Sequence, residues 1–345
     1  MNFDALLLGA KKVKASDIHM MEDSAPFFRI NGDLKKVDVP PISGKELQEI
    51  LRRMMPHHLM RELESQRGCD FSYQLGTEIR FRCVAFYSMG KLGIVMRLIP
   101  LTIPTIEDLQ LPEVLRTVAR NPRGMVLLTG MTGSGKSTTL AAMLDHVNKN
   151  EYAHILSVED PIEFVHTSQK CLINQREVHR DTHGFNEALR AALREDPDYI
   201  LVGEMRDIET IRLALTAAET GHLVFATLHT SSAAKTVDRI IDVFPAGEKP
   251  MVRSMLSESL RAVISQSLLK KVGGGRIAAH EIMVGIPAIR NLIREDKVAQ
   301  MYSAIQTGAQ YGMQTLDQCL LDLVKRGLVT RQQAIGYAKN KESFK

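Results

Sequence analysis

The stretch GMTGSGKS, residues 130–137, constrains the fold of this chain more than any other segment. It fits the pattern G-x-x-x-x-G-K-[ST], follows the apolar run GMVLL and precedes STTLAAMLDHVNK, which has helical spacing. The glycines let backbone N–H groups turn inward around a phosphate, and the helix amino terminus adds positive potential. The segment therefore predicts a strand, a phosphate-binding loop and a helix, and with them a nucleoside triphosphate site.

Each residue of this loop has an expected task. Lys136 is expected to neutralise the β- and γ-phosphates, and the hydroxyl of Ser137 to bind Mg²⁺. A glycine-rich turn without a ligand is the alternative, which the flanking strand and helix disfavour. The residues expected to contact the nucleotide are Gly130, Met131, Thr132, Gly133, Ser134, Gly135, Lys136, Ser137 and Thr138.

Apolar runs alternate with helical stretches on either side of the loop. The runs GMVLLTG, HILSVED, DYILVGE and HLVFATLHT each end in polar or glycine residues. Such alternation is typical of a parallel sheet covered by helices, whose working residues gather at the carboxyl ends of the strands. The predicted fold class is therefore α/β, with the ATPase core over residues 121–272.

Two of these runs end in carboxylates. The stretch VEDPIEF leaves Glu159, Asp160 and Glu163 on a loop because its proline breaks the strand, and DYILVGE ends in Glu204. Hydrolysis needs a carboxylate that orients or deprotonates water near the γ-phosphate. A single acidic loop residue is common, but two acidic strand ends beside one phosphate loop favour a catalytic role.

Two histidines flank the run LVFATL. His222 and His229 are seven positions apart, so on a pleated strand they point to opposite faces. His229, at the carboxyl end, is the candidate for contact with the γ-phosphate, and His222 is the candidate for a structural hydrogen bond. From the sequence, either is equally well read as a hydrogen-bonded core histidine.

Residues 1–99 predict a separate α+β domain, because strand-like runs are mixed with helical spacing. The turn signal Asn31-Gly32 lies between two extended runs, and Met89-Gly90 joins two further strands. The stretch SGKELQEILRRMM predicts a helix with one apolar face, formed by Leu47, Ile50, Leu51 and Met54. Prolines at 100, 104 and 112 then predict a stiff linker over residues 100–120.

Composition excludes several other classes. The net charge is only +4 and the chain has no Trp, which disfavours an aromatic-lined nucleic-acid channel. None of the four cysteines forms a C-x-x-C pair, so a zinc knuckle is not predicted. No apolar run approaches the ~20 residues that cross a bilayer, and we expect a soluble cytosolic protein.

Taken together, four segments resemble a known family. GMTGSGKSTT, SVEDPIEF, LREDPDYILVGEMRD and TGHLVFATLHTSSAAKTVDRIID resemble the four signature boxes of the type II/IV secretion ATPase superfamily, in the same order. The resemblance covers residues 130–242. It implies a RecA-like core, ATP and Mg²⁺ as ligands, a homohexameric ring, and a PAS-like domain at residues 1–99.

The resemblance also implies roles for single residues. Glu163 corresponds to the general base, Glu204 to the Walker B glutamate near Mg²⁺, and His229 to a residue near the γ-phosphate. Arg194 of LREDPD corresponds to a further contact on the phosphate side.

Two arginines of the first domain fall where the family places arginines that act on their own or an adjacent site. These are Arg82 and Arg97, and arginines on a solvated strand face remain the alternative for both. The loop itself departs from the family at Met131, where proline is usual, and this predicts a less preorganised loop.

The late stretch PAIRNLIRED indicates which group within the superfamily the chain resembles. As a helix begun by its proline, it places Ile289, Leu292 and Ile293 on one side and two arginines on another, which by pattern alone is an ordinary amphipathic surface helix. With AAHEIM before it and QMYSAIQTGAQYGMQTLDQCL after it, AIRNLIRE is similar to a signature of the pilus retraction ATPases. The two arginines are Arg290 and Arg294, which we expect to transmit or receive motion rather than to act in catalysis.

The similarity implies a motor that retracts type IV pili. It implies action at the cytoplasmic face of the inner membrane, on the pilus platform protein and through it on the pilin filament, without direct contact with nucleic acid. Assembly and secretion ATPases often carry a tetracysteine zinc module, which SQSLLKKVGGGRIAAHEIM lacks, and residues 273–345 read as largely helical. An accessory or an assembly/secretion ATPase of the same superfamily, and more distantly a RecA-like nucleic-acid translocase, remain alternatives.

Overall fold

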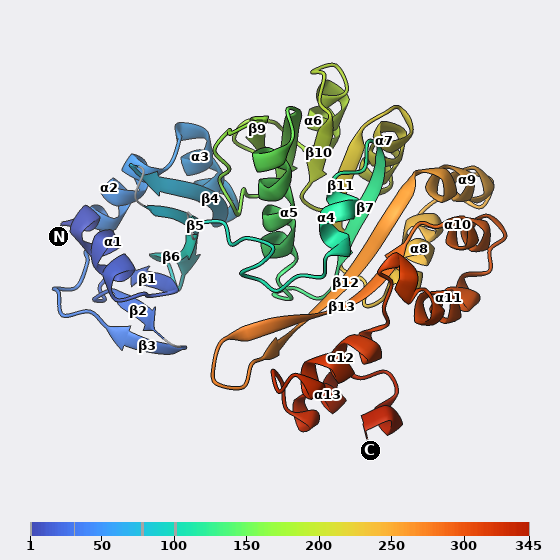
Figure 1. Ribbon diagram of the computed structural model, residues 1–345. Coiled ribbons are helices and arrows are strands. Elements are labelled where there is room, and N and C mark those ends of the chain that lie inside the picture. The colour runs from blue at the N-terminus through green and yellow to red at the C-terminus, as the bar shows by residue number, and fades with distance from the viewer. Residues whose placement is uncertain (1, 31, 77–78, 100–101, 345) are drawn as a thin grey trace. The chain divides into compact units, whose positions relative to one another are not determined.

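A computed structural model describes residues 2–30, 32–76, 79–99 and 102–344 of the chain (Figure 1). The chain divides into two compact units. The first comprises Met1–Thr102 with Pro161–Val165, and the second comprises Ile103–Asp160 with His166–Lys345. The boundaries predicted from the sequence, with a separate linker over residues 100–120 and a carboxyl-terminal region from residue 273, stay predictions.

The first unit is an α+β structure built on a six-stranded antiparallel sheet with the strand order β3-β2-β1-β6-β5-β4. Its elements are α1 (Phe3–Lys12), β1 (Asp17–Met21), β2 (Phe27–Ile30), β3 (Asp33–Lys36), α2 (Gly44–Met54), α3 (His57–Gln66), β4 (Gly68–Leu75), β5 (Ile79–Ser88) and β6 (Lys91–Ile99).

Local sequence explains several of these elements. The predicted apolar face of α2 is buried in full, and the side chain of Ser43 caps the helix by accepting a hydrogen bond from the backbone N–H of Glu46. Met89 and Gly90 both have positive φ, 52° and 77°, as a two-residue hairpin turn between β5 and β6 requires. Strands β2 and β3 pair antiparallel as predicted, although Asn31 between them lies outside the described residues.

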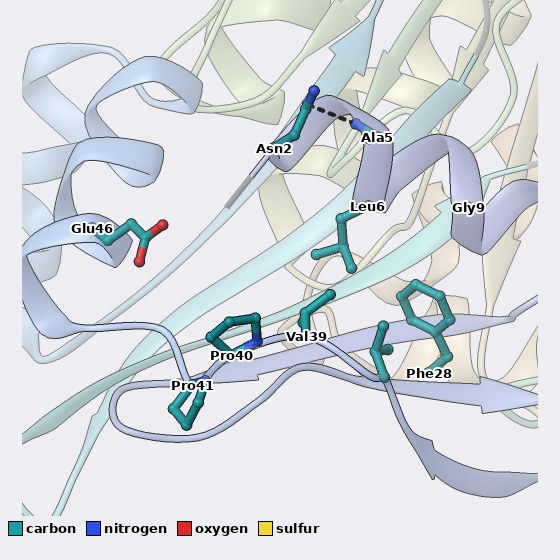
Figure 2. A pocket seen from close by; sticks show the side chains of 10 residues that line it. Asn2, Ala5, Leu6, Gly9, Phe28, Val39, Pro40, Pro41 and Glu46 are labelled. Atoms are coloured by element: carbon teal, nitrogen blue, oxygen red, sulfur yellow. Dashed lines mark hydrogen bonds between the residues drawn. The ribbon is translucent and has the colours of Figure 1, made fainter.

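The first unit contains a mostly apolar pocket of about 400 Å³. Figure 2 shows Leu6 of α1, Phe28 of β2 and the loop residues Val39 and Pro40 directed toward the same space. The pocket does not involve any residue predicted to act on the nucleotide.

The second unit is built on a seven-stranded sheet with the strand order β13-β12-β7-β11-β10-β8-β9, parallel except for β13. The elements up to the middle of the sheet are α4 (Val114–Ala119), β7 (Gly124–Thr129), α5 (Lys136–Asn150), β8 (His154–Glu159), β9 (Leu172–Glu177), α6 (Phe185–Ala192), β10 (Tyr199–Val202), α7 (Ile208–Glu219) and β11 (Leu223–Leu228). The remaining elements are α8 (Ala233–Asp242), α9 (Lys249–Ser259), β12 (Leu260–Lys270), β13 (Arg276–Val284), α10 (Pro287–Arg294), η1 (Val298–Gln300), α11 (Met301–Thr307), η2 (Ala309–Tyr311), α12 (Leu316–Lys325), α13 (Arg331–Tyr337) and η3 (Lys341–Phe344).

Both faces of this sheet are buried, which explains why its central strands are apolar throughout. In β7, Met125 and Leu127 pack with the helices α6 to α11, whereas Val126 and Leu128 pack with α4 and α5 on the other face. Ile106 and Leu115, from the segment predicted as a linker, are buried in the second of these cores. The parallel strands predicted from the sequence are therefore confirmed, with helices on both sides.

The last helices of the chain pack against the edge of the same sheet. Helices α12 and α13 pack against the β12–β13 hairpin, where Leu320 and Leu323 join Leu269 in a separate apolar cluster (Figure 1). Within the described ranges, no helix is both long and apolar enough to span a bilayer.

Candidate active site

The predicted phosphate loop connects the carboxyl end of β7 to the amino end of α5. Gly130 has φ 141° and lies so close to β12 that a Cβ would be 2.3 Å from the backbone oxygen of Gln266. Ser134 donates its backbone N–H to the carbonyl oxygen of Met131 at 3.1 Å, so the loop closes as a turn without proline. The side chain of Met131 is 70% exposed and lies outside the turn's packing.

The interior of the loop fits a phosphate group. Lys136 is the first residue of α5, is buried, and places Nζ 2.8 Å from the carbonyl oxygen of Gly130 and 3.1 Å from that of Met131. The hydroxyl of Ser134 is buried and has no hydrogen-bond partner among the residues that the structure describes. A buried cation and an unpartnered hydroxyl, at the amino terminus of a helix of 15 residues, together match the charge and the acceptors of a phosphate.

Strands β7, β11, β10 and β8 are parallel neighbours, so their carboxyl ends share one edge of the sheet. Thr129, the last residue of β7, pairs with Leu228, and this register brings the phosphate loop beside His229. Thr227 donates its hydroxyl to the carbonyl oxygen of Gly203 at 2.6 Å, which fixes the turn that carries Glu204. The fold thus collects the loop, the glutamate and the histidine at one edge.

Glu204 is held between two basic side chains. His229 Nε2 lies 3.1 Å from Oε1, and Arg206 donates from Nη2 to Oε2 at 2.7 Å. The hydrogen bond from Arg206 lowers the pKa of Glu204 most, burial partly opposes it, and the charges of Arg206 and His229 lower it further. The carboxylate is therefore ionised at neutral pH and fixed in orientation. Arg206 was not predicted, although an arginine two positions after a strand-end glutamate is a signal that the sequence offered.

The loop residues differ in exposure. Thr132 and Gly133 are exposed, whereas Ser137 and Thr138 are half-buried in the first turn of α5. Across the described residues, no cluster of three or more His, Cys, Asp or Glu side chains could hold a metal ion by itself.

Two predicted residues, Arg194 and His222, lie at the opposite edge of the sheet. Arg194 is exposed and precedes β10, whose amino end lies on the opposite edge of the sheet. His222 precedes β11, and its Nδ1 lies 2.9 Å from the carbonyl oxygen of Ala217. Glu163 follows β8 but belongs to the residues grouped with the first unit.

The two arginines predicted in the first unit are direct cross-strand neighbours, Arg82 on β5 and Arg97 on β6. Arg97 is 70% exposed and donates from Nε to Asp17 at 2.9 Å, while Arg82 lies 4.0 Å from Asp70. Burial raises the pKa of Asp17, but hydrogen bonds from Ser16 and Arg97 outweigh it and leave the pKa below its usual value. Each arginine of this like-charged pair thus has a carboxylate beside it.

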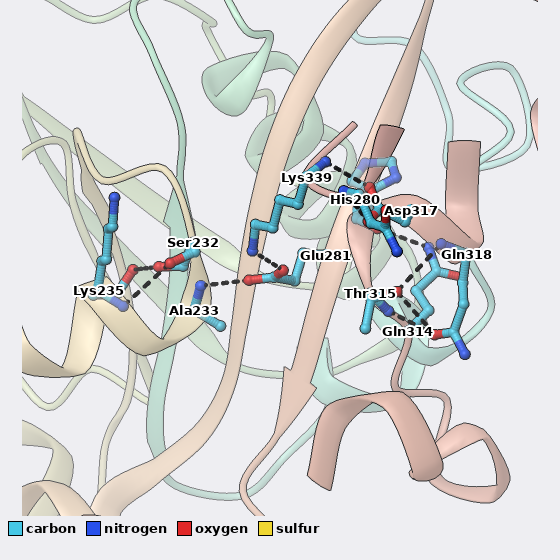
Figure 3. Close-up of polar contacts among 12 residues, drawn as sticks. Ser232, Ala233, Lys235, His280, Glu281, Gln314, Thr315, Asp317, Gln318 and Lys339 are labelled. Carbon is cyan, nitrogen blue, oxygen red and sulfur yellow. Dashed lines mark hydrogen bonds and ion pairs between the residues drawn. The ribbon is translucent and has the colours of Figure 1, made fainter. Parts of the chain in front are cut away.

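The helix that follows the histidine is anchored from β13 (Figure 3). Glu281 is 3% exposed; one of its oxygens accepts the backbone N–H of Ala233, the first residue of α8, at 2.8 Å. Its other oxygen lies 2.5 Å from Nζ of Lys339, close to the end of the chain. Glu281 therefore holds the start of α8, a contact between distant segments that the sequence analysis did not predict.

One buried histidine, His280, and one partly buried histidine, His166, predict a loss of stability in mild acid. Burial lowers the pKa of His166 and of His280 to about 4 from an ordinary 6.5. Above pH 6.5 neither state is protonated at these rings; between pH 6.5 and 4 the unfolded chain gains protons that the folded chain does not, so stability falls. Each histidine contributes up to about 3 kcal/mol of this loss. Urea unfolding followed by circular dichroism at pH 7.5 and 5.0 measures it.

Two variants serve as the comparison for this pH dependence. His166→Gln is expected to reduce the difference between the two pH values, whereas His57→Gln, at an exposed position of α3, leaves it unchanged. An unchanged difference in His166→Gln would contradict the assignment to buried imidazole.

Similarity to known proteins identifies the family of this chain. The family model described as Type II/IV secretion system protein matches residues 2–335, so this chain belongs to that family. Within it, the chain is 60% identical to the type IV pilus retraction ATPase PilT of Pseudomonas aeruginosa over 344 residues, with 100% of both chains covered. It is 56% identical to a twitching motility protein of Neisseria gonorrhoeae, covering 92% of this chain and 86% of the relative.

A solved structure gives the same result. The crystal structure of the pilus retraction motor PilT with bound ADP matches with a TM-score of 0.93 at 43% identity, covering 99% of this chain and 98% of that one. The predicted family and the predicted α/β fold are confirmed, and the chain is a nucleotide-binding ATPase. The roles of single site residues stay predictions.

Proposed function

We propose that this chain is an ATP-hydrolysing motor that powers the retraction of type IV pili. The full-length identity of 60% to a pilus retraction ATPase carries the proposal. The match extends over the carboxyl-terminal region outside the nucleotide site.

In the proposed reaction, the triphosphate lies in the loop of residues 130–137, with Lys136 neutralising its β- and γ-phosphates. Ser137 and Glu204 are the residues that would hold Mg²⁺, which when bound neutralises charge on the phosphate oxygens. Arg206 and His229 keep Glu204 ionised and oriented. Glu163 accepts the proton of the attacking water.

The proposed motor is a homohexamer whose sites are completed by the amino-terminal domain. Arg82 and Arg97 stabilise the charge of the transition state, so hydrolysis depends on how that domain is oriented. Successive closure and opening around the ring would turn the platform protein of the inner membrane and draw pilins back. The chain then works in the cytoplasm at the membrane face, without direct contact with nucleic acid.

Helix α10 is the proposed coupling element. Ile289 and Ile293 are buried beneath it, Arg290 donates to the carbonyl oxygen of Gly285 at 2.7 Å, and Arg294 pairs with Glu258 at 2.7 Å on the surface. Both partners, Gly285 and Glu258, lie outside the phosphate loop.

Combining Arg290→Ala with Arg294→Ala is expected to leave more than about half of the ATPase rate while abolishing retraction. The exposed ion pair of Arg294 contributes little stability, and among the described residues Arg290 bonds only a backbone carbonyl within the same segment. Phosphate release by the purified protein and the shortening of labelled pili in cells measure the two effects. Lys325→Ala combined with Arg331→Ala, at exposed positions of α12 and α13, is the control. Normal retraction by the α10 double variant would exclude a coupling role for this helix.

Complementation tests the proposed function as a whole. Expressed in a strain that lacks its retraction motor, the chain should restore pilus shortening and surface motility, and Glu204→Ala should abolish both. If pili stay long while the purified protein hydrolyses ATP, an accessory or an assembly/secretion ATPase is the better description. ATPase activity that rises with DNA and falls steeply with salt would instead indicate a nucleic-acid translocase.

A further inference from the structure

Gln266 on β12 connects the phosphate loop to the interior of the second unit. Strand β12 runs parallel to β7, and the pairing of Ser265 with Thr129 places Gln266 beside the first glycine of the loop. Gln266 is only 3% exposed, and both polar atoms of its amide have hydrogen-bond partners. Nε2 donates to the carbonyl oxygen of Ser134 at 2.7 Å, and Oε1 accepts the hydroxyl of Thr139, in the first turns of α5, at 2.8 Å.

The direction of the first bond matters for nucleotide binding. In a trans peptide the carbonyl and the following N–H point in opposite directions. Because Gln266 holds the carbonyl oxygen of Ser134 on the β12 side, the N–H of Gly135 is directed away from β12. Thr139, whose hydroxyl bonds Gln266, also donates its backbone N–H to the carbonyl oxygen of Gly135. The amide of Gln266 therefore holds this segment at two points, directly at Ser134 and through Thr139 at Gly135.

His280 fixes which way the amide of Gln266 points. The two residues are paired across β12 and β13, and His280 Nε2 lies 3.2 Å from Gln266 Oε1. Since Oε1 can only accept, Nε2 of His280 carries the proton. The backbone of His280 is held in turn, with its N–H 3.4 Å from the sulfur of Cys319 and its carbonyl oxygen accepting from Gln314 at 3.0 Å (Figure 3).

We propose that Gln266, oriented by His280, is a positioning residue for nucleotide binding that holds the Ser134–Gly135 peptide of the phosphate loop in its phosphate-binding orientation. The inference rests on the nucleotide-binding part of the proposed function and adds to it two residues from outside the loop. Both lie on strands that follow the four signature segments, in the carboxyl-terminal third of the chain.

The first test replaces Gln266 by methionine, which has a similar length and no hydrogen-bonding amide. The KM for ATP and the equilibrium Kd for a fluorescent ADP analogue are expected to rise about tenfold, with kcat within about threefold, because the loop binds ground state and transition state alike. Gln332→Met, at an exposed position of α13, is the control and should match the parent. A variant that binds ADP with the parent's affinity overturns the proposal, even if it is less stable.

Two further variants keep the test valid if Gln266→Met folds poorly. Gln266→Glu still accepts from Thr139 and His280 but, when ionised, cannot donate to Ser134, so it should weaken ADP binding at least as much. His280→Phe leaves Gln266 in place but removes one of the two hydrogen bonds to Oε1 that orient its amide, so it should weaken binding several-fold. Unchanged ADP affinity in folded protein for either variant overturns the proposal. Failure of the parent chain to bind ADP would reject the proposed function instead.

Discussion

Replacing Glu204 by glutamine is expected to lower the rate of ATP hydrolysis by about 100-fold or more, while the Kd for ADP changes by less than about threefold. Glu204 is the ionised carboxylate at the edge where β7, β10 and β11 end, and both of its oxygens are held, by His229 and by Arg206. Glutamine has nearly the same shape but no negative charge, so it stabilises a bound metal ion or a developing positive charge less than glutamate does. Phosphate release at saturating ATP and equilibrium ADP binding measure the two quantities.

The control for this variant is Glu219→Gln, an equally conservative change at the exposed end of α7. It should leave both turnover and binding unchanged. A Glu204→Gln protein that hydrolyses ATP within about threefold of the parent would contradict the assigned role, and Glu163 would then be the first carboxylate to examine.

Replacing Gly130 by alanine is expected to raise the Kd for ADP more than about 100-fold, because the loop can no longer lie against β12. At φ 141° an L-residue is strained, and the added Cβ would meet the backbone oxygen of Gln266 at 2.3 Å and the hydroxyl of Ser134 at 2.7 Å. A backbone oxygen within a sheet cannot move aside as a flexible side chain can. Equilibrium binding of ADP and the thermal unfolding midpoint, measured on the same preparation, test this.

Gly221→Ala separates the two causes. Gly221 also has a positive φ, 120°, but a Cβ there meets nothing within 4 Å, so this control carries the backbone strain without the collision. We expect it to lose stability by about 1–3 kcal/mol and to bind ADP normally. If Gly130→Ala binds ADP as tightly as Gly221→Ala, the close approach of β12 does not determine the shape of the loop.

The strands of the second unit were predictable because their burial on both faces leaves a direct trace in the sequence. Runs such as MVLL and YILV are apolar at every position, which a half-exposed strand does not require. The hairpin turn at Met89-Gly90 was predictable for a different reason, since the residue types that accept positive φ are few. Helix α4, by contrast, lies within a proline-containing segment that read as a linker, and its burial in the same apolar core as α5 stabilises it.

The residues of the candidate site likewise include some that the sequence predicted and others that it did not. Lys136, Glu204 and His229 follow strands that the sequence identified, so their position at one edge follows from the rule for parallel sheets. Arg206, Glu281 and Gln266 act through side-chain contacts whose partners lie elsewhere on the chain or whose geometry depends on a turn. No spacing rule covers a glutamine that meets a loop 132 positions away.

By itself the sequence determined the α/β fold class, the phosphate loop with its lysine, and the family to which the chain belongs, because each depends on local patterns of burial, φ and residue type. The tertiary structure alone decided that Gln266 lies against the loop, that Glu281 holds the start of α8, and that Arg206 and His229 share one carboxylate. The contacts of Gln266, Glu281 and His229 depend on strand order and register, whereas that of Arg206 depends on the turn after β10. Register is set by the packing of the whole sheet, so it leaves no signal at the positions that it brings together.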